Sequence, residues 1–156
     1  MVLVESLSVE NIVANANFSN PKNAISALVS LLDEGKQIPE KLYDKVVSQL
    51  IEREKQMSTG IGKGVALPHC ALDEIDDFCV ALAVLEKGIN FEAIDDEPVF
   101  LIVLLLSPKS KMQMHVKNLA GIAKFLSNED TKQNLISLKN PTLIKKFIED
   151  NATHAK

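Results

Sequence analysis

The sequence predicts an α/β protein in which a central sheet lies between two layers of helices, a three-layer α/β/α arrangement. Two near-continuous apolar runs, residues 78–85 and 99–106, have the length and composition of strands that are buried on both faces. Segments with apolar residues at helical spacing come before these runs and after them. Helices on both sides of the strands in the chain can cover both faces of the sheet.

The part of the chain before the first apolar run predicts two helices. Asn20 and Pro21 are typical of a helix start, where a capping side chain precedes a proline at the first helical position. The spacing of apolar residues extends this helix to Glu34. A second helix is expected to begin near Pro39 and to carry Arg53 at its C-terminal end.

Three shorter stretches are predicted as turns or short strands. Residues 6–18 fit either a short strand or a helical turn. Residues 88–91, which begin with glycine, are expected to form a turn that enters a short strand. Residues 95–98 are expected to form the turn that enters the second long strand.

Helical spacing returns from Lys111, and two shorter helices are expected after this one. The last of them is expected to start at Asn140-Pro141. The tail, residues 151–156, contains His154 and is expected to be frayed. One stripe of the helix that starts near Lys111 carries His115, Leu119, Ile122 and Leu126.

Composition excludes several classes of partner. The chain has 156 residues, of which 46% are hydrophobic and 24% charged, as in an ordinary globular domain. Seventeen basic and 21 acidic residues give a net charge of −4, and the lysines form no dense block. Nucleic acid and anionic membrane surfaces are therefore not expected as partners, because phosphate groups require clustered Lys and Arg.

The same sequence indicates a cytoplasmic protein. The longest apolar run, residues 99–106, is shorter than the roughly 20 residues that span a bilayer. Glu5 and Glu10 lie where a signal peptide would need basic and apolar residues. Cys70 and Cys79 have no metal-ligand spacing, and two reduced thiols are expected, although a disulfide between them stays open.

A glycine-rich stretch, residues 58–69, is the most informative part of the chain, and we call it the glycine segment. Its sequence is S-T-G-I-G-K-G-V-A-L-P-H, with Gly60, Gly62 and Gly64 at alternate positions. Glycine permits positive φ and close approach to the backbone, and successive amides in such a segment can bind an anion. Pro68 restricts the backbone just before His69 and helps to aim the imidazole.

The glycine segment does not match the common nucleotide motifs. In a P-loop, Met57 would be glycine and Gly64 would be Ser or Thr. In the dinucleotide fingerprint, Val65 would be glycine. A plain turn is the alternative. We interpret the segment as a phosphoryl-binding site that uses no nucleotide.

His69 is the predicted nucleophile. A neutral imidazole nitrogen attacks phosphorus well, and a phosphorylated imidazole is a good donor. An ordinary surface histidine is the alternative. Arg53 could neutralise phosphoryl oxygens, or it is a solvated arginine at a helix end. Ser58 or Thr59 could donate a hydroxyl to the phosphoryl group, or only hold the turn. His115 lies on an apolar helix stripe, where it is either a core histidine or a second imidazole at the site.

These residues together resemble the phosphorylation site of the enzyme IIA family of the bacterial phosphotransferase system, in its fructose, mannitol and nitrogen-regulatory class. The matching residues before the first apolar run are Arg53-Glu54, Ser58 to Gly62, Ala66 and Pro68-His69. The later ones are Gly88-Ile89, Phe91, Asp95, Pro98-Val99, Leu105, Pro108, His115, Leu119, Ile122-Ala123 and Leu126. The resemblance covers nearly the whole chain, and several spaced motifs are more specific than the glycines alone.

The resemblance implies a mixed sheet and one enzyme IIA domain over residues 1–156. It implies a phosphotransferase component in which His69 accepts a phosphoryl group from a phosphohistidine on the carrier HPr or on its nitrogen-branch counterpart. Residues matching Arg53 and His115 sit beside that histidine in the family and support the charge. No cofactor or metal is expected, because the donor histidine already carries activated phosphate.

Two positions depart from the family pattern and bear on the output of the site. Cys70 stands where glycine is common, which places a thiol beside His69. Asp96 stands where sugar-specific members often have glycine, which favours the nitrogen-regulatory branch. The chain shows no fused transporter, which also favours regulation through a partner that senses phosphorylation. The alternatives are transfer to a cysteine of an enzyme IIB during sugar uptake, and a binding domain that has lost phosphotransfer.

Overall fold

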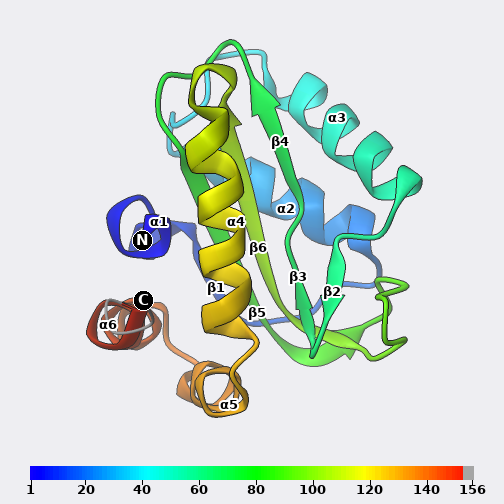
Figure 1. Ribbon diagram of the computed structural model, residues 1–156, viewed down its shortest axis with the longest axis vertical. Helices are drawn as coiled ribbons and strands as arrows, with labels where there is room; N and C mark the ends of the chain where they lie inside the picture. The colour runs from blue at the N-terminus through cyan, green and yellow to red at the C-terminus, as the bar shows by residue number, and fades with distance from the viewer. Residues whose placement is uncertain (153–156) are drawn as a thin grey trace.

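The computed structural model describes residues 1–152 and has a six-stranded sheet between two layers of helices (Figure 1). This confirms the predicted three-layer α/β/α fold. One layer consists of α2 (Pro21–Glu34) and α3 (Tyr43–Gln56). The other consists of α1 (Val2–Glu5), α4 (Met112–Leu126), α5 (Glu129–Leu138) and α6 (Pro141–Ala152).

The sheet is mixed. Its strands are β1 (Ile12–Ala16), β2 (Gly60–Gly62), β3 (Val65–Ala66), β4 (His69–Leu72), β5 (Cys79–Ile89) and β6 (Val99–Pro108). The order is β1-β5-β6-β3-β2, and β4 also pairs with β6. β5 is antiparallel to β6, whereas β3 and β4 follow one another along the other edge of β6 and are parallel to it.

Strand β6 is buried on both faces, as its unbroken apolar sequence predicts. Successive side chains of a strand point to opposite faces. Ile102, Leu104 and Leu106 pack in the core shared with α2 and α3, whereas Leu101, Val103 and Leu105 pack in the core shared with α4, α5 and α6. The sheet therefore separates two cores, and its central strand contributes alternate side chains to each of them.

The helices that the sequence predicts are present, and they differ from the prediction at two boundaries. α3 begins at Tyr43 and not near Pro39, because Lys41 has a φ of 67° and this left-handed conformation interrupts a helix. α6 continues to Ala152, so the first two residues of the tail are helical and not frayed. His154 lies outside the described residues.

Residues 6–18, for which the sequence allowed a short strand or a helical turn, contain both. A one-turn 3₁₀ helix, η1 (Val9–Asn11), leads directly into β1. The helix α1 was not predicted. Its side chains Val2 and Leu3 are buried against the α4–α6 layer. Within residues 1–152, no helix is long and apolar enough to cross a membrane.

The expectation of a turn and a short strand at residues 88–91 is wrong. β5 continues through Gly88 to Ile89, and residues 90–98 form no strand. A Cβ on Gly88 would lie 2.7 Å from Cβ of Pro98 and 2.9 Å from the ring of Phe100. Glycine is needed here because the neighbouring strand approaches closely, and not because the chain reverses.

This close approach predicts opposite effects for two glycine-to-alanine substitutions. Gly88→Ala should lower the free energy of unfolding by about 1–3 kcal/mol, because the new methyl group overlaps Pro98 and Phe100. Gly121→Ala, on α4, should raise it by about 0.5–1 kcal/mol, because alanine favours the helix and its methyl group meets only Cε of Met1, at 3.9 Å. Urea denaturation measures both, and equal stability of the two variants would contradict the steric argument.

Candidate phosphoryl-transfer site

The glycine segment folds as a β-hairpin and not as an open loop. β2 pairs antiparallel with β3, and the chain reverses at Lys63-Gly64. Gly62, Lys63 and Gly64 have φ values of 94°, 56° and 79°, so the glycines permit the reversal. The amide of Lys63 donates to Oδ2 of Asp95 at 2.8 Å, which ties the turn to the segment before β6.

The hairpin does not bring Gly62 and Gly64 to His69. The atoms nearest to a Cβ on Gly62 belong to Asp95 and Ile94, and those nearest to one on Gly64 belong to Lys132 and Pro98. Gly60 packs on Ala93, and its amide donates to the hydroxyl of Ser58. The described contacts of these three glycines are therefore with the 91–98 segment and α5, and phosphoryl binding by their amides stays a prediction.

His69 is the first residue of β4 and is half-buried. Its Nδ1 lies 2.6 Å from the carbonyl oxygen of Leu67, two residues earlier, and Pro68 lies buried between them. A carbonyl only accepts hydrogen bonds, so Nδ1 carries the proton. This tautomer leaves the lone pair on Nε2, the nitrogen that can act as a nucleophile.

His115 faces His69 from α4. The ring centroids are 5.3 Å apart and the ring planes are inclined by 54°. Only 6% of His115 is exposed, and its Nδ1 lies 2.7 Å from Oγ of Ser107. His115 is thus a buried histidine that also lies against His69, so the two sequence interpretations are compatible in geometry, and its part in phosphoryl transfer stays a prediction.

Ser107 was missed by the sequence analysis. It is fully buried on β6, two residues after Leu105, which pairs with His69. The signal was present, because Ser107 is the first polar residue after the apolar run and stands eight positions before His115. Only the tertiary packing of α4 on β6 brings the two side chains together.

Arg53 and Glu54 contribute opposite charges at the end of α3. Nη1 of Arg53 donates to the carbonyl of Met57 at 2.7 Å, which holds the guanidinium beside the turn out of the helix. The carboxylate of Glu54 accepts from the amide of Thr59 at 3.0 Å and from its hydroxyl at 2.6 Å. The hydroxyl of Thr59 is therefore committed to Glu54, and the role that the sequence analysis expected for it stays a prediction.

Burial and these charges set the protonation of the two imidazoles. The pKa of His69 is lowered, mainly by burial and further by the charge of Arg53, while the bond to Leu67 and the charge of Glu54 oppose the shift. The pKa of His115 is also lowered, by burial and by its proximity to His69. Since both pKa values lie below that of an ordinary histidine, the neutral form of each ring predominates at pH 7.

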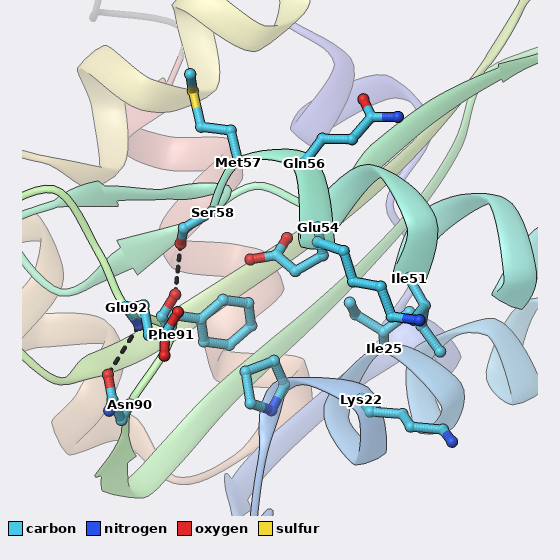
Figure 2. Close-up of a pocket in the computed structure, with 12 residues that line it drawn as sticks. Lys22, Ile25, Ile51, Glu54, Gln56, Met57, Ser58, Asn90, Phe91 and Glu92 are labelled. Atoms are coloured by element: carbon cyan, nitrogen blue, oxygen red, sulfur yellow. Dashed lines mark hydrogen bonds between the residues drawn. The ribbon is translucent and has the colours of Figure 1, made fainter.

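Ser58 supports a cavity beside the site. Its hydroxyl donates to the carbonyl of Phe91 (Figure 2). It also accepts from the amide of Gly60, and the expected role of Ser58 in phosphoryl binding stays a prediction. The cavity, of about 550 Å³, lies between the start of α2, the end of α3 and residues 90–92. Glu54 and Ser58 line it, but His69 does not. It is adjacent to the candidate site and separate from it.

The cysteines are free and unreactive in character. Cys70 and Cys79 pair with Leu106 from opposite edges of β6, so about two strand spacings, or roughly 10 Å, separate them, too far for a disulfide. Burial raises the pKa of Cys70 to about 12 and that of Cys79 to about 11. The thiol beside His69 is therefore protonated at neutral pH, and a protonated thiol is a poor target for oxidation.

The arrangement defines a class of protein in which one neutral imidazole can attack phosphorus while a second imidazole and an arginine stand beside it. Residues 1–152 contain no group of three His, Cys, Asp or Glu side chains that could hold a metal ion. Residues 5–151 match the family described as phosphoenolpyruvate-dependent sugar phosphotransferase system, EIIA 2. The chain belongs to this family, whose members are phosphotransferase components.

Relatives from both functional branches of the family resemble the chain. A nitrogen regulatory protein of Bradyrhizobium diazoefficiens is 32% identical over 135 residues, which cover 86% of each chain. A fructose-specific EIIA component of Haloferax volcanii is 27% identical over 129 residues, covering 83% of this chain and 82% of that one. The crystal structure of nitrogen regulatory protein IIA-Ntr from Neisseria meningitidis superimposes with a TM-score of 0.85 at 25% identity, over 95% of this chain and 99% of that one.

The opposing charges of Arg53 and Glu54 predict a matched pair of substitutions. Arg53→Gln should raise the pKa of His69, because a cation that disfavours the imidazolium is removed. Glu54→Gln should lower it, because an anion that favours the imidazolium is removed. Histidine side-chain NMR over pH 4–8 measures both shifts, and shifts of the same sign in the two variants would refute this account of the site.

Proposed function

We propose that the protein is a phosphocarrier in which Nε2 of His69 accepts a phosphoryl group from the phosphohistidine of HPr or of an HPr-like carrier. The observation that carries this proposal is the bond from Nδ1 of His69 to the carbonyl of Leu67. It leaves a single nucleophilic nitrogen, and the lowered pKa keeps that nitrogen unprotonated at neutral pH. Membership of the EIIA family supports the same chemistry.

In the transfer step, the lone pair of Nε2 attacks phosphorus while the phosphorus–nitrogen bond to the carrier's histidine breaks. The carrier's imidazole leaves with the electron pair of that bond. His69 keeps its only ring proton on Nδ1, so no base has to remove one. The positive charge that develops on the ring is stabilised by the Leu67 carbonyl, which accepts the Nδ1 hydrogen bond.

Arg53 and His115 are the groups we assign to the phosphoryl oxygens. Arg53 is the only arginine of the chain, and its charge already acts on His69 in the absence of phosphate. His115 is the neighbouring imidazole, and its ring is neutral at pH 7. A phosphoryl group adds a charge of about −2, which a cation and an oriented donor stabilise.

We further propose a nitrogen-regulatory output, in which phosphorylation of His69 decides which partner binds. The relatives named nitrogen regulatory protein support this branch, while the fructose-specific relative supports the alternative of transfer to an enzyme IIB. Asp96 is weaker support for the nitrogen-regulatory branch than the sequence alone suggested. Its φ of 58° is a conformation that glycine also adopts, so either residue fits the turn.

The phosphocarrier role predicts a specific modification. Incubation of the protein with phosphoenolpyruvate, enzyme I and HPr or its nitrogen-branch counterpart should add one acid-labile phosphoryl group, measured by intact-protein mass. His69→Ala should abolish this gain, whereas the matched control His154→Ala should retain it. A His69→Ala protein that still gains one phosphoryl group would exclude His69 as the acceptor, and no gain on the unsubstituted protein with either carrier would exclude the phosphocarrier role.

The output is tested by the fate of the phosphoryl group. In a regulatory protein, phosphate should stay on His69 when purified enzyme IIB proteins of the fructose and mannitol type are added. In a transport component, at least one enzyme IIB should remove it rapidly and become labelled on its cysteine. Phosphotransfer gels measure both results, with a His69→Ala protein as the blank, and rapid transfer would overturn the regulatory assignment.

A further inference from the structure

Ser107 carries a buried hydroxyl that contacts the imidazole of His115. It lies on β6 with 0% of its surface exposed, and its Oγ is 2.7 Å from Nδ1 of His115. On the same face of β6, Leu105 pairs with His69 on the neighbouring strand. Ser107 thus contacts, at Nδ1, the ring that faces His69.

The surroundings of the Ser107 hydroxyl determine whether it donates or accepts in its bond to His115. Among residues 1–152, the bond to His115 is the only side-chain hydrogen bond of the Ser107 hydroxyl. A buried O–H without an acceptor is costly, because it loses its bonds to water and gains none. Nδ1 of His115 is the acceptor within reach, so the hydroxyl donates and Nδ1 receives.

A donating Ser107 fixes the tautomer of His115. A neutral imidazole has one proton, and with Nδ1 acting as acceptor that proton lies on Nε2. The ring is then a hydrogen-bond donor at Nε2, the nitrogen that is not bonded to Ser107. The opposite tautomer would present a lone pair there, and a lone pair repels phosphoryl oxygens.

We propose that Ser107 is a positioning residue that holds His115 as the neutral, Nε2-protonated tautomer, so that His115 donates a hydrogen bond to the phosphoryl group on His69. The inference rests on the proposed function. His69 and His115 thereby hold complementary tautomers, each set by an oxygen behind the ring: the Leu67 carbonyl for the nucleophile and the Ser107 hydroxyl for the donor.

The same bond disfavours the imidazolium form of His115. A second proton on the ring would go to Nδ1, and Ser107 would then have to accept. Its own O–H would be turned towards the apolar core formed by β6 and α4. Burial of His115 and its proximity to His69 act in the same direction, lowering the pKa of His115.

The tautomer can be tested without any carrier protein. Nitrogen-15 NMR of the histidine side chains, on the full chain at pH 7.5, should show His115 protonated on Nε2 and unprotonated on Nδ1. In Ser107→Ala the His115 pKa should rise and the two tautomers should mix, whereas Ser107→Thr, which keeps the hydroxyl, should restore the single tautomer. The exposed Ser110→Ala is the matched control and should change neither. Protonation of Nδ1 in the unsubstituted protein would overturn the proposal.

The kinetic consequence is tested separately. With a phosphorylated carrier, Ser107→Ala should accept the phosphoryl group about tenfold more slowly, the effect of losing one oriented hydrogen bond in transfer. Ser107→Thr should recover most of the rate. An unchanged rate in Ser107→Ala would overturn the positioning role. If the unsubstituted protein accepts no phosphate, the proposed function fails, while the NMR result still decides whether Ser107 sets the tautomer.

Discussion

The pairing of β6 along both of its edges is the constraint on which the sheet and the candidate site depend. β5 occupies one edge, and β3 and β4 share the other. The alternation of side chains on β6 divides the interior into two cores, one under α2 and α3 and one under α4 to α6. The pairing of β4 with β6 fixes the position of His69, and α4, which carries His115, packs on the same strand. The distance between the two imidazoles therefore depends on the sheet.

The electrostatics of the site follow from a compromise over His69. Burial and Arg53 favour the neutral ring, which is the form that can attack phosphorus. The Leu67 carbonyl and Glu54 favour positive charge on the ring, the charge that the proposed phosphorylated form would carry. The proposed phosphotransfer needs both influences, because the ring would be neutral when it attacks phosphorus and cationic while it carries the phosphoryl group.

Several residues that the sequence analysis grouped with His69 form hydrogen bonds that hold the backbone. The hydroxyl of Ser58 donates to the carbonyl of Phe91, and that of Thr59 donates to the carboxylate of Glu54. The glycines form a hairpin whose turn contacts the segment before β6 and α5. Some residues of the family motif therefore make structural contacts that the sequence alone did not indicate.

The sequence by itself determined the layered fold, the extent of α2 and the residues that identify the family, because these depend on local spacing and on side-chain type. It did not determine that Gly88 lies inside a strand, since the reason is the close approach of Pro98 and Phe100 from the neighbouring strand. Nor did it show that Ser107 contacts His115, which is eight residues away and on a different element. Tertiary structure alone decided these points, because a steric contact or a buried hydrogen bond exists only once two separate segments are packed together.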